Sequence, residues 1–134
     1  MLRSQYAILA EHFRIGQSGT FDLLGVFDRI FAGGIPAQHR QMVLVVLLVA
    51  SSEDNLGPHE FVLQWTAPSG KLLAEQRSTF VVKPEAGTWL GSARLIFEFQ
   101  NLVLPEVGKY RFRIQVDGVE VAEHVLSVAL KNAK

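Results

Sequence analysis

The sequence predicts an all-β protein built as an antiparallel β-sandwich of about eight or nine short strands. Apolar and polar residues alternate along several segments, which is the pattern of strands with one buried face. Short turn sequences rich in glycine, proline, aspartate and serine separate these segments at nearly regular intervals. No long segment repeats apolar residues at the spacing of an amphipathic helix. These three observations together indicate two packed sheets.

The composition is that of a folded protein, and we expect a single domain over residues 1–134. Hydrophobic residues make up 49% of the chain and charged residues 19%, a balance that excludes a disordered chain. Because the chain has no cysteine, it has no disulfides, thiolate metal sites or cysteine nucleophiles. Thirteen basic residues balance thirteen acidic ones, so no basic excess favours nucleic acid, and weak self-repulsion makes self-association easier.

The distribution of apolar residues bears on where the protein works. The longest uninterrupted apolar run, residues 42–50, has nine residues, which is too short to span a bilayer and suits a buried strand. The N-terminal residues have neither the long apolar region nor the small-residue cleavage site of a secretory signal. We therefore expect a soluble, cytoplasmic protein that does not contact membranes.

The first part of the chain contains three predicted strands. Residues 5–15 form the first and end in a turn at residues 16–19. Residues 20–31 form the second, which has apolar residues at both odd and even positions. A loop at residues 33–41 leads into the third strand, residues 42–50.

The middle of the chain continues the same pattern. A polar loop at residues 51–58 precedes a strand at residues 59–67, in which apolar and polar residues alternate. The Pro-Ser-Gly turn at residues 68–70 leads into a strand at residues 71–82. The alternation is clearest at residues 91–100, where aromatic and aliphatic residues are expected to face the core.

The last strands form the most strongly predicted hairpin. Residues 109–116 alternate, and Asp117-Gly118 follows directly, a pair that suits the two positive φ angles of a type I′ turn. In the final strand, residues 119–130, the apolar positions change parity part of the way along. A bulge near residues 122–124 would keep both sets of apolar side chains inside.

Two segments give the predicted sandwich an immunoglobulin-like character. The segment LVLPEVGKY, residues 102–110, resembles the tyrosine corner of immunoglobulin-like and fibronectin-type folds. That resemblance implies that the Tyr110 hydroxyl bonds to backbone upstream of it. Trp65 and the turn after it resemble the Trp-bearing strand of these folds, and Phe112 stands where antibody domains have their second cysteine. The expectation is therefore an immunoglobulin-like architecture rather than an antibody domain.

Four segments spread over most of the chain are similar to an uncharacterised bacterial family of small immunoglobulin-like β-sandwich proteins, a domain of unknown function. They are YAILAE near the N-terminus, LLGVFDRIFAGGIP, the turn APSG, and GKYRFRIQVDG near the C-terminus. The resemblance implies the fold and carries no activity, catalytic residue or cofactor.

Catalytic and metal-binding patterns are weak throughout. Residues 16–20 nearly match the G-x-S-x-G elbow, but Thr20 replaces the last glycine and the turn joins two strands. The four histidines, at positions 12, 39, 59 and 124, are scattered singly, unlike the short spacings typical of metal ligands. Three arginines, Arg94, Arg111 and Arg113, are expected on one outer face in cross-strand ion pairs. We expect no enzyme activity, no metal and no cofactor.

The segment GVFDRIFAGGIP, residues 25–36, is the candidate interaction site. Its odd-numbered and even-numbered positions are both mostly apolar, yet the charged residues Asp28 and Arg29 lie in the middle. One interpretation places these two charges at a sheet edge, where one of them ties down the following loop. The other makes an exposed apolar patch rimmed by the charges, which is typical of a partner surface. The patch would comprise Phe27, Phe31, Ile35 and Pro36.

Two functions are compatible with these features. The first is a non-enzymatic protein-interaction or structural module that forms a homo-oligomer or joins a larger assembly. The first and last strands are then expected at sheet edges, and a symmetric dimer would bury Ile8 together with residues 27–36. The alternative is a small apolar-ligand carrier, with a pocket between the sheets. That pocket would be lined by Trp65, Phe80, Phe97 and Phe99.

Overall fold

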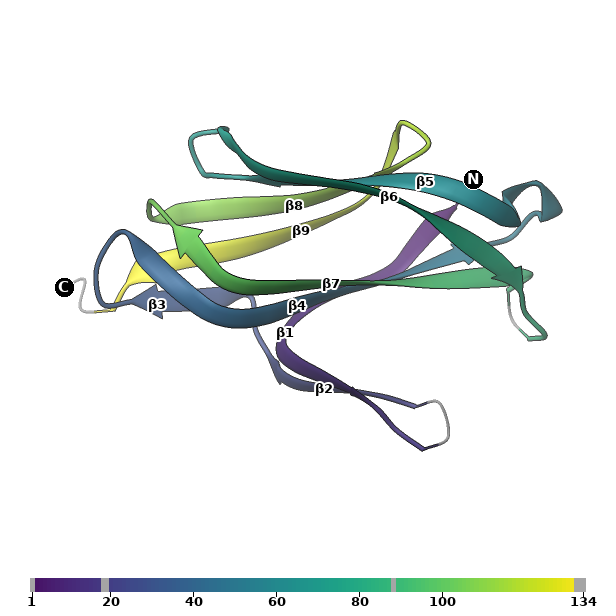
Figure 1. Cartoon of the computed structure of the whole chain (residues 1–134), viewed down its shortest axis with the longest axis horizontal. Helices are drawn as coiled ribbons and strands as arrows, with labels where there is room; N and C mark the ends of the chain where they lie inside the picture. The colour runs from purple at the N-terminus through teal and green to yellow at the C-terminus, as the bar shows by residue number, and fades with distance from the viewer. Residues whose placement is uncertain (1, 18–19, 88, 132–134) are drawn as a thin grey trace.

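Within residues 2–17, 20–87 and 89–131, which the computed structural model describes, the chain forms nine strands and one 3-10 helix (Figure 1). In chain order the elements are β1 (Arg3–Ile15), β2 (Phe21–Val26), β3 (Arg29–Ala32), β4 (Ala37–Ala50), η1 (Glu53–Asn55), β5 (Gly57–Thr66), β6 (Leu72–Pro84), β7 (Gly91–Leu104), β8 (Gly108–Val116) and β9 (Val119–Leu130). The all-β prediction is confirmed. No helix in this described part is long and apolar enough to cross a membrane.

The strands form one continuous mixed sheet in the order β2-β1-β4-β7-β6-β5-β8-β9-β3. The prediction of a purely antiparallel fold is wrong at one place, because β3 pairs with β9 in parallel. The two predicted sheets are also joined, since the ends of β6 and β7 pair at Lys83–Ser92 and Pro84–Gly91. Figure 1 shows the result, a sheet curled into a half-barrel in which β6 meets β7 at one end.

The main core lies between the two halves of the curled sheet. Phe61 on β5 packs edge-on against Phe97 on β7, with ring centroids 5.2 Å apart. Phe99 on β7 similarly contacts Phe112 on β8 at 5.5 Å. Because β6 and β5 separate β7 from β8 in the sheet order, these contacts cross the core rather than run along the sheet. Burial of these rings, together with the aliphatic residues of the same cluster, holds the halves together.

Strand β4 is buried on both faces, which explains the apolar run at residues 42–50. Met42 and Leu44 belong to the main core, whereas Val43 and Val45 belong to a second cluster on the opposite face. Side chains of the β1–β2 hairpin pack against this second cluster: Tyr6, Phe13, Phe21 and Leu23. A strand covered on both sides has no polar face to show, so its sequence does not alternate.

The predicted strand at residues 20–31 is in fact two strands that belong to opposite halves of the sheet. Strand β2 pairs with β1, and β3 pairs with β9. Gly25 has a φ of 71°, a left-handed conformation that glycine adopts without strain, and the chain leaves β2 just after it. The Phe27 N–H then bonds to the Leu9 carbonyl, and the Ser127 N–H bonds to the Asp28 carbonyl.

This split corrects the prediction that the first and last strands lie at sheet edges. Strand β1 lies between β2 and β4, and β9 lies between β8 and β3. The two outermost strands are β2 and β3, which come from one short internal segment. The prediction failed because it treated residues 20–31 as a single strand on one sheet.

The β8–β9 hairpin turns at Asp117 and Gly118, whose φ angles are 50° and 84°, as a type I′ turn requires. The register shifts because Ile114 lies opposite Ala122, whereas Gln115 lies opposite Glu120. Val121 is therefore the extra residue, one position before the predicted bulge. The shift lets Leu126 and Val128 of β9 face the core.

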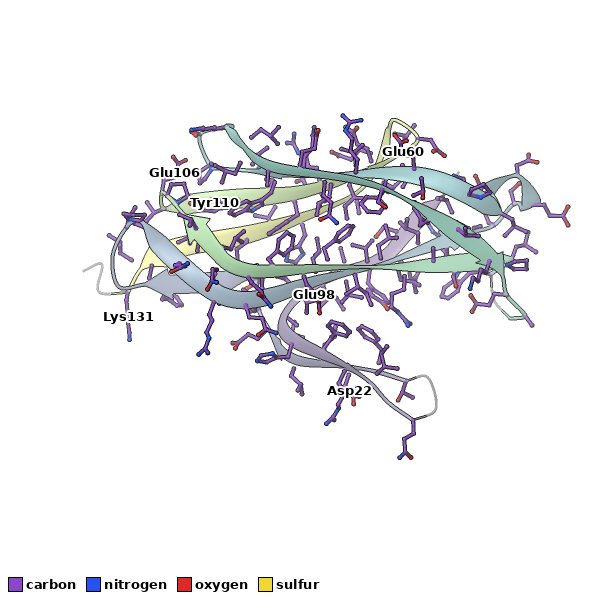
Figure 2. All side chains as sticks on the ribbon, in the orientation of Figure 1. Asp22, Glu60, Glu98, Glu106, Tyr110 and Lys131 are labelled. Atoms are coloured by element: carbon purple, nitrogen blue, oxygen red, sulfur yellow. The ribbon has the colours of Figure 1, made fainter. Side chains whose placement is uncertain are left out.

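The tyrosine at the start of β8 links the core to the turn before it. The Tyr110 hydroxyl donates to the Glu106 carbonyl at 2.6 Å and accepts from the Glu106 N–H at 2.9 Å (Figure 2). Its ring stacks on Trp65, which also stacks on Phe112. These contacts are of the kind that the tyrosine corner makes, and the tyrosine ring itself is fully buried.

The predicted arginine stripe is divided between two surfaces. Arg111 and Arg113 on β8 bond to Glu123 on β9, at 2.6 Å and 3.2 Å. Arg94 instead lies over the ring of Phe21, 4.8 Å from its centroid, in the other half of the sheet. The prediction of one face is wrong because β7 and β8 are not neighbours.

Candidate functional site

The predicted interaction residues fall into an exposed group and a group that lines a pocket. We call residues 21–36, which contain β2, β3 and the turns after them, the edge segment. Within it Phe31 is 59% exposed and Ile35 is 38% exposed. Leu24 and Val26 on β2, which the sequence did not single out, are 49% and 62% exposed. Pro36 is exposed as well.

Three other predicted residues, Ile8, Phe27 and Asp28, meet in an apolar pocket of about 280 Å³ where the chain crosses from β2 to β3. We call it the crossing pocket. Its other lining residues are Ala7, Leu9, Val26 and His124. Phe27 is half-buried and packs against His39, with ring centroids 5.2 Å apart. Ile8 and Phe27 are therefore walls of a pocket and not the exposed contacts that the sequence suggested.

His124 is the polar side chain of this pocket that sequence reasoning missed. Burial lowers the pKa of its imidazole, although a hydrogen bond to the Ala7 carbonyl and the nearby Asp28 carboxylate act in the opposite direction. The ring is thus neutral near pH 7. Its Nε2 is buried and has no hydrogen-bond partner among the described residues. No local sequence pattern predicts that His124 lies in this pocket. Its neighbours there come from β1 and the β2–β3 turn, which are far from it in the sequence.

Asp28 and Arg29 both lie at the sheet edge with exposed side chains. No ion pair involving either residue occurs in the described part of the chain. Asp28 contributes through its backbone carbonyl, which accepts from the Ser127 N–H at 3.0 Å and so fixes the start of β3 against β9. The pair is therefore a solvated rim beside the exposed apolar residues.

A second polar cluster joins η1 to the β8–β9 hairpin. His59 Nδ1 lies 2.6 Å from Asp117 Oδ2, and His59 Nε2 lies 2.8 Å from the Asn55 carbonyl oxygen. Asp117 Oδ1 also accepts the Glu60 N–H at 3.0 Å. The carboxylate thus holds both the histidine and the backbone of β5.

The protonation of this cluster follows from its geometry. Burial alone lowers the pKa of His59, but the hydrogen bonds to Asp117 and Asn55 outweigh it and raise that pKa. The bond from His59 correspondingly lowers the pKa of Asp117. Both ring nitrogens face acceptors, so neither is free to act as a general base. The cluster is a structural clamp.

Two further candidates from the sequence concern a metal ion held by the histidines and a nucleophilic serine at residues 16–20. Glu11, His12 and His39 line a polar hollow, but the described residues contain no group of three side chains placed to hold a metal ion. Ser18 and Gly19 of the near-match to the nucleophile elbow lie outside the described residues.

The ligand pocket expected between the sheets is only partly present. Trp65 and Phe99 line a pocket of about 200 Å³ between β5, β6 and β7. Phe97 is instead buried in the core against Phe61, and Phe80 stacks on His59 with centroids 5.6 Å apart. The four aromatic residues therefore do not form one cavity.

Comparison with known proteins gives a family and a set of distant structural similarities. A family model described as a family of unknown function (DUF6941) matches residues 5–129. No curated protein sequence matches the chain.

Three solved structures are similar to this one. The alkylpurine DNA glycosylase AlkC of Pseudomonas fluorescens, bound to DNA containing an abasic site analogue, is 11% identical with a TM-score of 0.48; the match covers 96% of this chain and 30% of that chain. An immunoglobulin-like protein from Pseudomonas aeruginosa is 12% identical with a TM-score of 0.45, and the match covers 96% of both chains. A β-glucosidase from Listeria innocua is 14% identical with a TM-score of 0.44, covering 96% of this chain and 16% of that chain.

Proposed function

The chain belongs to the family of unknown function DUF6941, so its role has to be inferred from its own residues, and we propose that it is a non-enzymatic interaction module of immunoglobulin-like architecture. Its partner is a protein, most simply a second copy of the same chain, and its surface of contact is the edge segment. We further propose that it works in the cytoplasm. Its fold does not depend on disulfides, because the chain has no cysteine, so the reducing conditions there do not weaken it.

The observation that supports this proposal is the combination of free strand edges and exposed apolar side chains. β2 and β3 are the two outermost strands of the sheet. Leu24 and Val26 on β2, Phe31 on β3 and Ile35 just after it are all substantially exposed. A protein that works alone covers such edges or places charges on them, because bare apolar edges associate. An aromatic residue with a rim of charges, here Phe31 with Asp28 and Arg29, is also typical of a binding hot spot.

A small apolar-ligand carrier remains the second candidate, and the crossing pocket is the observation that favours it. Its walls are apolar, and His124 and Asp28 offer two polar groups to orient a ligand. Its volume of about 280 Å³ is just below the ~300–1,000 Å³ that is usual for ligand sites. The exposed edges, which a carrier does not need, make the interaction module the better explanation.

The experiment is size-exclusion chromatography with light scattering on the wild type, Leu24→Asp, Phe31→Asp and Val81→Asp. Val81 on β6 is about as exposed as the two test residues but lies outside the edge segment, so it is the matched control. We expect the wild type and Val81→Asp to associate, and the two edge variants to be folded monomers. Ile8 is a poor choice for this test because it lines the crossing pocket.

A wild type that stays monomeric at high concentration would contradict self-association. A dimer that survives both edge substitutions would place the contact elsewhere on the molecule. Circular dichroism of each variant separates loss of contact from loss of fold, since exposed apolar-to-charged substitutions normally leave stability almost unchanged.

A further inference from the structure

Strands β6 and β7 diverge soon after they meet. They pair only at Lys83–Ser92 and Pro84–Gly91, although β6 has 13 residues and β7 has 14. Beyond this junction, the ladders in the described residues bond β6 to β5 and β7 to β4. Each strand therefore carries a row of backbone N–H and C=O groups that no neighbouring strand uses. Figure 1 shows β6 rising away from β7 beyond the junction, and we call the opening between them the seam.

The inner face of β6 is uncovered along the seam. Residues directly opposite each other on antiparallel neighbours point to the same face of a sheet. Three residues of β6 lie opposite buried core residues of β5: Ala74, Gln76 and Ser78 opposite Trp65, Leu63 and Phe61. All three β6 residues are nevertheless exposed. The inner side of this strand thus faces a space that no other part of the described chain fills.

A pocket of about 200 Å³ lies in the seam, with walls from three strands. We call it the seam pocket. Leu63 and Trp65 of β5, Ala74 and Gln76 of β6, and Phe99 of β7 line it, together with Glu75. Trp65 Nε1 is buried and has no hydrogen-bond partner in the described part of the chain. A buried indole N–H normally has an acceptor, so the described chain leaves the polar end of Trp65 unsatisfied beside this pocket.

We propose that the seam binds an extended segment of another protein, which adds as a strand along β6. Its backbone would pair with the free edge of β6, and one large apolar side chain would enter the seam pocket. The segment therefore has large apolar residues at alternate positions on the side that faces the core.

The chemistry of the site favours a peptide over other ligands. A small apolar molecule would fill the pocket but leave the backbone edge of β6 unpaired. A pocket of this volume is also smaller than the usual ligand site and suits a single anchoring side chain. This proposal involves the seam and not the edge segment, so it stands or falls independently of the function proposed above.

The test is selection of short random peptides displayed on phage against the wild type, followed by affinity measurement with synthetic copies of the enriched peptides. Ala74→Phe fills the seam pocket, because Ala74 lines it and is exposed. Thr79→Phe adds the same ring on the outer face of β6, where Thr79 lies opposite Glu60, and is the matched control. We expect enriched peptides with alternating apolar residues. Compared with the wild type, Ala74→Phe should bind them about tenfold or more weakly, and Thr79→Phe should bind them with the same affinity.

Hydrogen exchange with a bound peptide supplies a second measurement that does not depend on a variant. Strand addition protects backbone amides of β6, and we expect that protection there. The proposal is wrong if no peptide is enriched, if Ala74→Phe binds the peptides as tightly as the wild type does, or if protection falls on β2 or β3. It is also wrong in its choice of partner if Ala74→Phe converts a wild-type dimer to monomer, since the occupant is then a second copy. Thermal unfolding of both variants verifies that they are folded.

Discussion

Tyr110 shows how one side chain holds both the core and a turn. Its ring is buried against Trp65, while its hydroxyl makes two hydrogen bonds to the backbone of Glu106. The Tyr110→Phe variant keeps the ring and leaves both backbone groups without their partner. We expect a loss of about 1–3 kcal/mol in the free energy of unfolding, measured by urea denaturation. Tyr6→Phe, at a half-buried position, is the control and is expected to change stability far less.

The clamp between His59 and Asp117 makes stability depend on pH in a defined direction. The pKa of His59 is raised above 6.5, so protonated His59 stabilises the fold fully below pH 6.5, and this contribution is lost as pH rises through the folded-state pKa. The pKa of Asp117 is lowered below 3.8, so its contribution is present above pH 3.8 and is lost as pH falls through the folded-state pKa. The clamp therefore stabilises the protein most between these two limits.

Asp117→Asn tests this dependence without breaking the turn. Asn-Gly suits a type I′ turn and keeps an oxygen to accept hydrogen bonds, but it removes the charge. As pH rises from 6, we expect the urea midpoint of the variant to decrease less than the urea midpoint of the wild type. The effect should stay below about 1 kcal/mol, because the Asp117 side chain is 54% exposed and well screened. An unchanged slope would show that His59 does not depend on this carboxylate. The lowered pKa of His124 gives the opposite slope in both proteins and so cancels in the comparison.

At the scale of elements, Gly25 determines how β2 ends. Its φ of 71° is costly for any residue with a Cβ, and an added Cβ would lie 3.2 Å from Cγ of Glu11. We expect Gly25→Ala to lower the free energy of unfolding by about 1 kcal/mol or more. Gly33→Ala is the control, since nothing lies within 4 Å of a Cβ there. Equal urea midpoints for the two variants would mean that the end of β2 tolerates another conformation.

The elements differ in how far the sequence predicts them. β5, β8 and residues 91–100 of β7 largely alternate because one face is buried and the other is wet, so their local pattern suffices. The break between β2 and β3 has no such signal. β3 is held by a parallel pairing with a strand near the other end of the chain, and such a pairing leaves no local pattern in the sequence.

The same distinction applies to the candidate site. Phe31 and Ile35 were predicted as possible contacts because apolar residues beside adjacent charges, glycine and proline are unusual in a strand. The placement of Ile8 and Phe27 beside His124, and of His59 beside Asp117, depends on how distant strands cross. Sequence pattern carries no information about such crossings, and only the three-dimensional structure shows them.

At the scale of the whole molecule, the two halves of the sheet are joined by a very short ladder at Gly91. An added Cβ there would lie 2.7 Å from the Lys83 carbonyl oxygen and would also clash with Leu56. Because backbone on both sides would have to move, we expect Gly91→Ala to lower the free energy of unfolding by about 2–3 kcal/mol. Gly34→Ala, where nothing is within 4 Å, is the control for urea denaturation. A stable Gly91→Ala variant would show that the junction between β6 and β7 is dispensable.

The parallel pairing of β3 with β9 has a consequence for how the protein is made. After β3 is made, a ribosome has to add residues 33–118 before it reaches β9. At ordinary rates of synthesis this delay lasts about 5–20 s, during which residues 29–32 have no strand to join. The nascent chain thus displays Phe31 to chaperones that hold apolar segments. The residue that we propose as a contact of the finished protein therefore lies in a strand that cannot pair until β9 has been synthesised.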